Sequence, residues 1–141
     1  MKLNWIIFFI LTGCTATGNS DKNDVRVVVQ GIIDADNAAD IASVLSSYSS
    51  DAVLMPPGKS EITGTTAIRK NYEAIFANSV LELSVKEEEL VVSGNYAICK
   101  GRTMGQIRAK ADSSVRDVND KFIMILEKRD SQWKISKLIW N

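Results

Sequence analysis

Aspartate and tyrosine are the residue types through which this chain could carry out acid–base chemistry. The 141 residues include no histidine, which excludes serine–histidine–aspartate and cysteine–histidine nucleophilic arrangements and imidazole-rich zinc sites. Asp36 follows Val29 by seven positions and Ile32 by four. On a helix it would therefore continue their apolar face, where burial raises the pKa of a carboxyl toward that of a useful general base. The more common role of such a residue is a solvated helix end or a cap.

Asp120 is the second candidate catalytic acid. It shares strand parity with Phe122 and Met124, so its carboxylate points into a cavity if that face is the inner one. Parity does not tell which face is inside, and a charge on the outer face is the more common arrangement. Tyr48 and Tyr72 lie on apolar stripes and carry a polar tip that could orient a ligand, although such tyrosines more often fill core.

Hydrophobic spacing predicts three helices that hold the N-terminal candidates. The first begins near Val25, and the others follow Asp40, which can cap its helix, and Thr63 or Gly64. A short extended piece, Ala52–Met55, lies between the second and third helices and ends in a Pro-Pro-Gly turn. The third helix is expected to end near residue 78.

After the third helix the hydrophobic period changes to two, which predicts strands. The alternating segments are residues 80–90, 95–107, 115–128 and 132–140. The order of elements predicts an α+β domain, in which a curved antiparallel sheet of about four long strands wraps over three N-terminal helices. Trp133 and Trp140 have opposite parity on the last strand, which predicts one in the core and one nearer a dimer face.

The first residues predict export and lipid attachment. The apolar run Trp5–Leu11 is far too short for a membrane helix, which needs about 20 residues, but suits a signal peptide. Residues 11–14, Leu-Thr-Gly-Cys, resemble the lipobox of bacterial lipoproteins. We therefore expect a signal peptide at 1–13, lipidation of Cys14, a polar tether over 14–24 and a domain at 25–141. The alternative is an ordinary secretory signal with a chance cysteine. Thr15, in place of aspartate, suggests anchoring in the outer membrane.

Charge and cysteine content limit the classes of binding partner and of covalent cross-link that we expect. The chain has 17 basic and 17 acidic residues, and loss of residues 1–13 removes Lys2 and leaves a formal charge of −1. Charges of both signs alternate along the chain, so no nucleic acid is expected to bind. With Cys14 lipidated, Cys99 is left as a single buried thiol. Cys99 also belongs to a strand face of small residues, which leaves room either for a cavity or for bulky helix side chains such as Phe76.

Three stretches carry a resemblance to a known superfamily. They are Asp36–Gly58, which ends in the Pro-Pro-Gly turn, Ile62–Ile68, and Asp120–Asn141, which ends in WKISKLIWN. In this order they resemble an uncharacterised branch of the nuclear transport factor 2-like cone folds, which include steroid delta-isomerases, SnoaL-like polyketide cyclases, scytalone dehydratases and the association domain of calmodulin-dependent kinase. The resemblance implies a cone that encloses an apolar pocket, commonly in a homodimer packed sheet to sheet.

The catalytic residues of the isomerase relatives are absent from this sequence. Their general-base aspartate corresponds to Met55 or Pro56, and their oxyanion-binding tyrosine falls near Ile32. The resemblance therefore implies no particular reaction, metal or cofactor. It does imply an apolar pocket, and the residues that we expect to line it are Ile32, Asp36, Tyr48, Met55, Tyr72, Phe76, Cys99 and Phe122.

Three functions follow as hypotheses. The favoured one is a noncatalytic, membrane-tethered module that binds a small apolar or amphipathic molecule in the cone. The second is an isomerase, dehydratase or hydrolase that uses aspartate and tyrosine alone, which requires a buried carboxylate of raised pKa near a tyrosine. The third is a structural or interaction lipoprotein of the cell envelope, with a filled cone and an exposed apolar sheet face.

Overall fold

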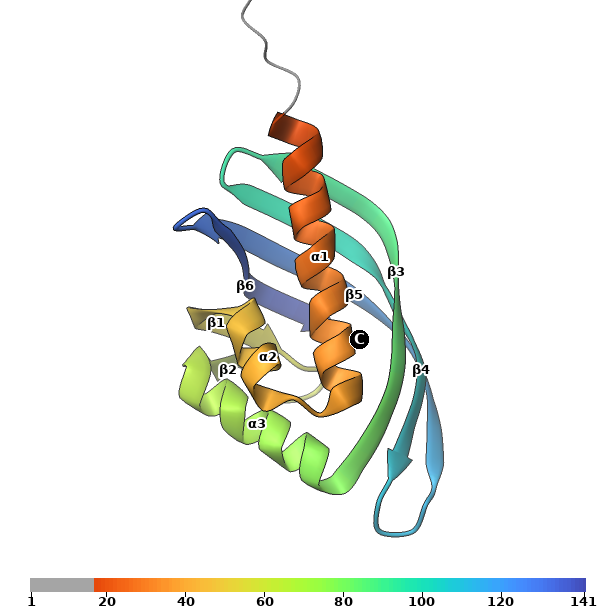
Figure 1. Cartoon of the computed structure of the whole chain (residues 1–141). Helices are drawn as coiled ribbons and strands as arrows, with labels where there is room; N and C mark the ends of the chain where they lie inside the picture. Colours follow the sequence, from red (N-terminus) through yellow and green to blue (C-terminus); the bar gives the residue numbers. More distant parts are fainter. Residues whose placement is uncertain (1–16) are drawn as a thin grey trace, which may run out of the picture.

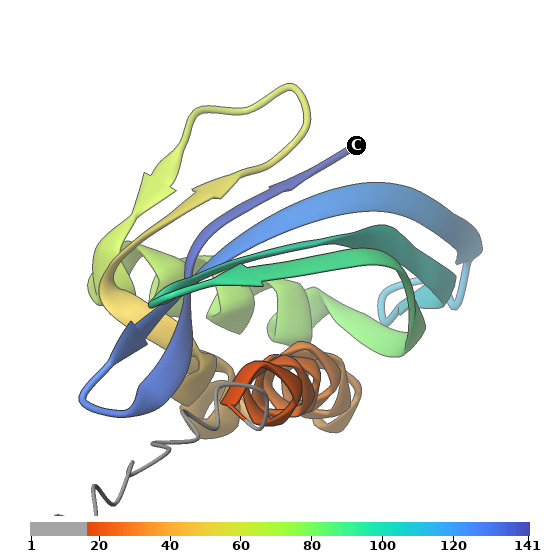
Figure 2. The same cartoon turned by 90° about the horizontal axis from the view of Figure 1, so that it is seen from above.

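The computed structural model describes residues 17–141 and contains three helices on one side of a curved six-stranded sheet (Figures 1 and 2). The helices are α1 (Thr17–Ala38), α2 (Ile41–Ser47) and α3 (Gly64–Asn78). The strands are β1 (Tyr48–Met55), β2 (Ile62–Thr63), β3 (Ser79–Ser93), β4 (Tyr96–Ala109), β5 (Val115–Arg129) and β6 (Gln132–Trp140). Within these residues the predicted α+β class and the order of three helices before four long strands are confirmed. The extended piece expected at Ala52–Met55 is part of β1, which joins the sheet together with the two-residue strand β2.

The sheet has the order β2-β1-β6-β5-β4-β3. Neighbours pair antiparallel except β1 and β6, which run parallel. The long hairpins β3–β4 and β4–β5 form one side of the molecule, and Figure 2 shows them bowed over the helices. Their inner faces and the apolar faces of α1 and α3 together bury the core.

Helix α1 begins earlier than the sequence predicts. The expected start was Val25, with a tether before it, but residues 17–24 are helical. Asp21 accounts for the difference, because it pairs with Lys128 at 2.6 Å and accepts a bond from the indole of Trp133 at 3.4 Å. Both partners lie more than 100 residues away in sequence, so the local pattern gives no sign of them. Residues 1–16, which hold the predicted signal peptide and Cys14, lie outside the described part of the chain.

The end of α1 is fixed by one side chain and one turn. The Asn37 amide donates to the carbonyl of Leu83 at 2.8 Å and accepts from its N–H at 2.7 Å, which ties α1 to the free edge of β3. Ala39 has φ of 52°, so the helix stops there. Asp40 then accepts from the N–H of Ser43 at 3.1 Å, which confirms the predicted cap of α2. Asp36 is therefore held next to a well-anchored helix end.

Glycine permits the sharp curvature of the β3–β4 hairpin. Gly105 has φ of 138°, and a Cβ atom there would lie 2.0 Å from the carbonyl oxygen of Glu82 on the neighbouring strand. Gly101 likewise leaves space for the ring of Phe122. Residues with a side chain rarely adopt the φ value of Gly105, and a Cβ atom at either position would collide with β3. The two glycines therefore let the sheet bend over the helices.

A bulge in β6 corrects the prediction for the two tryptophans. Ile125 pairs with Lys137 but Leu126 pairs with Ile135, so Ser136 is an extra residue on β6. The bulge shifts the inward face by one position. Trp133 is therefore buried and Trp140 also faces inward, where it lines a cavity. The expectation that one of them faces a dimer partner is wrong.

Candidate functional site

A cavity of about 470 Å³ lies between the helices and the inner face of the sheet. Its wall is mainly apolar and comes from α1, α3, the β1–β2 loop and strands β3 to β6. The aliphatic part of the wall comprises Ile32, Ile33, Ile75, Leu81, Leu83, Ile107, Val118 and Leu138. A volume of this size holds a small organic molecule, and a mainly apolar wall with a few polar groups is typical of ligand pockets.

Asp36 is a partly buried acid in this wall. One of its carboxylate oxygens, Oδ1, is buried and has no hydrogen-bond partner among the described residues. Burial raises the pKa of the Asp36 carboxyl from 3.8 to about 7. The cause is the loss of hydration, which disfavours the charged form. Near neutral pH this carboxyl can therefore either hold or release a proton.

Tyr72 brings a phenol to the same cavity. Its hydroxyl lies 2.9 Å from the hydroxyl of Tyr48, which is enclosed behind it and does not line the cavity. Burial raises the pKa of both phenols, and the charge of Asp36 contributes to both shifts. If the Tyr48 hydroxyl donates to the Tyr72 hydroxyl, the Tyr48 proton is bonded and the Tyr72 proton is left to bond a ligand in the cavity. The reverse order leaves the Tyr48 proton without an acceptor, which is costly inside a protein.

The remaining polar residues of the cavity are arranged by depth. Asp120 and Thr103 lie partly buried on the inner face of β5 and β4, and Lys59 and Arg116 are exposed at the rim. Asp120 thus lies on the inner face of β5, on the same side as the buried Val118. The alternative considered from the sequence, a charge on the outer face of the strand, is therefore wrong for Asp120. The wall therefore has acids inside and bases at its edge.

The structure brings some of the predicted pocket residues together and separates others. Ile32, Asp36, Tyr72 and Phe122 line the cavity, as does the predicted acid Asp120. The other four do not line it, and they are Tyr48, Met55, Phe76 and Cys99.

Each of these four has a physical reason to lie elsewhere. Tyr48 and Phe76 pack against Tyr72 within the core. Met55 stands in register with the exposed Ile139, on the face of the sheet away from the helices. Cys99 is fully buried near Arg26 and Glu87, beneath the first half of α1. The small residues around Cys99 thus admit α1, and only Thr103 of that strand face reaches the cavity.

Several cavity residues were missed by the sequence analysis. Lys59, Arg116 and Trp140 come from the β1–β2 loop, the start of β5 and the end of β6. The parity of Arg116 with Phe122 was a usable signal, because both have even numbers on one strand. Trp140 could not be placed by parity, since the bulge at Ser136 reverses it.

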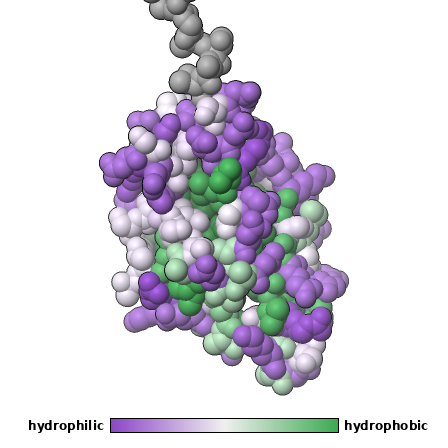
Figure 3. All heavy atoms as spheres, in the orientation of Figure 1, coloured by the Kyte–Doolittle hydropathy of each residue, from purple (hydrophilic) through white to green (hydrophobic). Residues whose placement is uncertain are grey.

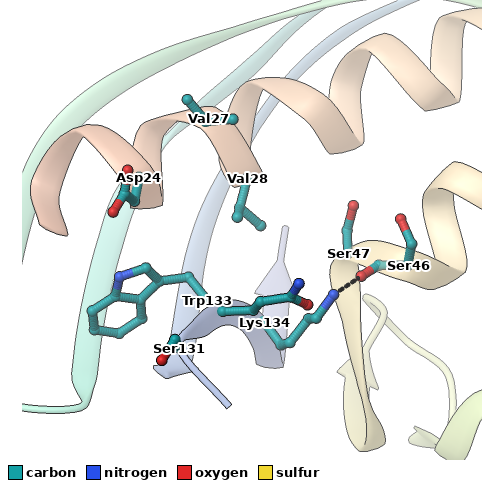
Figure 4. A pocket seen from close by; sticks show the side chains of 9 residues that line it. Asp24, Val27, Val28, Ser46, Ser47, Ser131, Trp133 and Lys134 are labelled. Atoms are coloured by element: carbon teal, nitrogen blue, oxygen red, sulfur yellow. Dashed lines mark hydrogen bonds between the residues drawn. The ribbon is translucent and has the colours of Figure 1, made fainter. Parts of the chain in front are cut away.

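A second cavity, of about 380 Å³, opens between α1, α2 and the β5–β6 turn (Figure 4). Lys134 crosses its floor and donates to the carbonyl of Ser46 at 2.6 Å. Val27 at its edge is 70% exposed, and the face in Figure 3 shows apolar surface in separate patches among polar residues. Neither buried side-chain oxygen that lacks a partner, on Asp36 or Ser49, lines it. The first cavity is therefore the stronger candidate site.

Among residues 17–141, no group of three or more cysteine, aspartate or glutamate side chains is placed to hold a metal ion. No helix in the same range is both long enough and apolar enough to cross a membrane.

Comparison with protein families matches residues 29–134 to the SnoaL-like domain. The chain belongs to this family. The matched segment includes the second half of α1, with Asp36, and all of β3, β4 and β5. It therefore contains most of the cavity wall. Among curated proteins, none matches the SnoaL-like chain.

Solved structures show the same fold. A ketosteroid isomerase-like protein from Erwinia carotovora atroseptica SCRI1043 superposes with a TM-score of 0.81 at 23% identity, covering 86% of this SnoaL-like chain and 95% of that one. A conserved protein from Planctomyces limnophilus superposes with a TM-score of 0.80 at 18% identity, covering 86% of this chain and 94% of that one. An NTF-2 like protein of unknown function from Shewanella oneidensis MR-1 superposes with a TM-score of 0.70 at 21% identity, covering 85% of this chain and 98% of that one. These likenesses establish the nuclear transport factor 2-like cone fold and leave the reaction open.

Proposed function

We propose that this SnoaL-like domain binds a small amphipathic molecule in the cavity between its helices and its sheet. The observation that carries the proposal is the cavity itself, which has about 470 Å³ of space behind a mainly apolar wall. Its few polar groups, above all Asp36 and Tyr72, are placed to orient one end of a ligand. An apolar body would be held by burial, at about 25 cal/mol per Å² of apolar surface removed from water.

Native mass spectrometry of the full chain, purified gently from its own host, tests this proposal. Ile75 of α3 lines the cavity, whereas its neighbour Ala74 is exposed. The variant Ile75→Trp should therefore fill the cavity, and Ala74→Trp is the matched control. We expect a retained small molecule in the wild type and the control and its loss from Ile75→Trp. Equal retention in all three proteins would place the ligand elsewhere, and no binding of any apolar probe would refute the proposal.

A second candidate function is proton transfer on a bound ligand. The specific observation in its favour is that Asp36, with its pKa raised to about 7, lines the same cavity as Tyr72. Ionised Asp36 could take a proton from a ligand carbon, and Tyr72 could donate a hydrogen bond to the oxygen on which negative charge develops. The usual residues of the isomerases are absent, so this arrangement would differ from theirs.

The pH dependence of turnover tests the catalytic alternative. Activity on a candidate ketone should rise with pH through an apparent pKa near 7, because Asp36 acts only when ionised. Asp36→Asn should abolish that activity while ligand binding persists. An Asp36→Asn variant that retains turnover would exclude Asp36 as the base.

A further inference from the structure

Oδ1 of Asp36 is an unsatisfied acceptor in the wall of a ligand cavity. Residues 17–141 contain two buried side-chain oxygens without a partner, and the other, the Ser49 hydroxyl, does not line this cavity. A buried acceptor that lacks a donor costs about 1–3 kcal/mol, so a ligand that supplies a donor at this point gains affinity. A ligand group that carries a donor, such as a hydroxyl or an ammonium, would satisfy this oxygen.

We propose that the ligand is an organic amine, with a small apolar body and an ammonium group that pairs with the Asp36 carboxylate. This inference rests on the proposed function, since it names the class of molecule that the cavity holds. It adds a charge requirement, which comes from the other groups in the wall.

A second carboxylate and three aromatic rings favour a cation over a neutral hydroxyl. Asp120 lines the same cavity, and no ion pair involves it within the described residues. Tyr72, Phe122 and Trp140 add rings from α3, β5 and β6. The faces of aromatic rings attract an ammonium group by about 0.5–2 kcal/mol, depending on desolvation. A hydroxyl would gain from Asp36 alone, whereas a cation would also be attracted by the Asp120 carboxylate and by the face of any of these rings that it approaches.

The basic residues of the site are placed so that they do not oppose this binding mode. Lys59 and Arg116 are exposed at the rim, where water screens their charge. A ligand carboxylate in the interior would instead lie near Asp36 and Asp120, and like charges repel strongly where the dielectric constant is low. The distribution of charge thus directs a cationic end inward and leaves an anionic substituent, if the ligand has one, at the rim.

Binding of an amine should release a proton. Below pH 7 the Asp36 carboxyl is protonated in the free protein, so the carboxylic acid gives up its proton as the ammonium ion pairs with the carboxylate. The other titratable groups in the cavity wall are Lys59 of the β1–β2 loop, Tyr72 of α3, and Arg116 and Asp120 of β5. Tyr48 of β1 lies behind Tyr72. The pKa of Asp36 is about 7, so Asp36 should control the pH dependence of binding between pH 6 and 8.

Four probes with one apolar body separate these possibilities, namely phenylbutylamine, phenylbutanol, phenylbutanoate and butylbenzene. Their affinities for the full chain would be measured by isothermal titration calorimetry at pH 6 and pH 8, in buffers of different ionisation enthalpy. At pH 8 we expect phenylbutylamine to bind about tenfold or more tightly than the other three, which corresponds to 1.4 kcal/mol. Between pH 8 and pH 6 its affinity should fall roughly tenfold, with proton release at the lower pH.

Matched variants assign the effect to Asp36. Asp36→Asn and Asp36→Leu should remove the advantage of the amine and its pH dependence, while butylbenzene binds as to the wild type. Asp34→Asn is the control, because Asp34 is an exposed carboxylate on the same helix, bonded only to Gln30. Circular dichroism would confirm that each variant is folded.

The outcomes distinguish the two proposals. If butylbenzene and the alcohol bind but the amine is no better, the amine inference is wrong and the binding function stands. Tighter binding of phenylbutanoate, or an unchanged amine affinity in Asp36→Asn, also overturns the inference. If none of the four probes binds, the binding function itself loses its support.

Discussion

Asp36 weakens the folded state whenever it is ionised, because its carboxylate is then largely desolvated and its Oδ1 has no hydrogen-bond partner among the described residues. Its folded pKa is about 7 and its ordinary value is 3.8. The folded protein therefore holds this proton over a pH range in which the unfolded chain has lost it. By linkage, the stability contributed by Asp36 is fully present below pH 4 and is lost as the pH rises to about 7.

The first prediction concerns this pH dependence. Relative to the wild type, Asp36→Asn should gain stability between pH 4 and pH 8, by up to about 4 kcal/mol at roughly 1.4 kcal/mol per unit of pKa shift. Urea unfolding of both proteins at pH 4, 6 and 8 measures the difference. Asp34→Asn should show no such trend. A difference between Asp36→Asn and wild type that stays constant with pH would mean that Asp36 ionises normally.

The second prediction concerns the hydroxyl pair of Tyr48 and Tyr72, which are 2.9 Å apart. Tyr72→Phe leaves the enclosed Tyr48 hydroxyl without a partner and should cost about 1–3 kcal/mol of unfolding free energy. Tyr48→Phe should cost less, because the Tyr72 hydroxyl can still reach the cavity. Urea unfolding of the two single variants and the double variant gives the comparison, and a larger loss for Tyr48→Phe would contradict the proposed direction of donation.

At the scale of elements, glycine has opposite effects in the sheet and in α1. Gly105 lies in β4 between the cavity residues Thr103 and Ile107, with φ of 138° and no space for a Cβ atom. Gly31 lies in the middle of α1, and a Cβ there would meet no atom within 4 Å. One glycine is therefore required by the bend of the sheet, and the other only weakens a helix.

The third prediction uses this contrast. Gly105→Ala should lower the unfolding free energy by about 1–3 kcal/mol or more, because the backbone is strained and β3 must move. Gly31→Ala should raise it by about 0.5–1 kcal/mol, because alanine loses less conformational freedom in a helix. Thermal and urea unfolding measure both changes. Destabilisation by Gly31→Ala would indicate a contact of this helix face that the single chain lacks.

At the scale of the whole molecule, the outer face of the sheet carries exposed apolar side chains. Ile98, Ile123 and Ile139, on β4, β5 and β6, are each more than 40% exposed, and Tyr96 lies at the end of β4 with 59% exposed. Such a face on a small domain suits association with a second copy. The expected homodimer therefore remains a proposal that this surface makes specific.

The fourth prediction tests the homodimer. The double variant Ile98→Lys, Ile123→Lys should sediment as a monomer at concentrations where the wild type is dimeric, and its cavity should still bind apolar probes. Glu73→Lys, a change at an exposed position of α3 on the opposite side of the sheet, raises the net charge by the same two units and serves as the charge control. A wild type that sediments as a monomer would remove the sheet-face dimer from consideration.

The fifth prediction concerns the proposed lipid anchor. Cys14 precedes the start of α1 by three residues, which reach at most about 10 Å. Asp36 lies 19 residues after Thr17, about 28 Å farther along the helix. Lipid-anchored protein should therefore hold Asn23 near the membrane and Lys59, at the rim of the cavity, far from it. With the protein attached to vesicles, a fluorescent label at Asn23 should be quenched strongly by quenchers carried on the lipids, and a label at Lys59 only weakly. Cys14→Ser should abolish attachment.

The sequence by itself determined most elements of the described domain. The apolar spacing from Val25 to Ile33, the cap at Asp40 and the change of period after Asn78 predicted the helices and long strands. They could be predicted because helices and strands impose their own periods on neighbouring residues. The resemblance carried by the Pro-Pro-Gly turn and the last strand predicted the family, which the match over residues 29–134 confirms.

Only the tertiary structure decided the cavity. Met55 and Cys99 had suitable residue types but lie on the outer face and beneath α1, whereas Asp120 and Trp140 face inward. The reason is that the inner face of a strand is set by what packs on it, and one bulged residue reverses the faces that follow. Likewise, the first turns of α1 depend on Asp21 and partners more than 100 residues away. Local sequence fixes the period of an element, but contacts between distant segments fix its face and its ends.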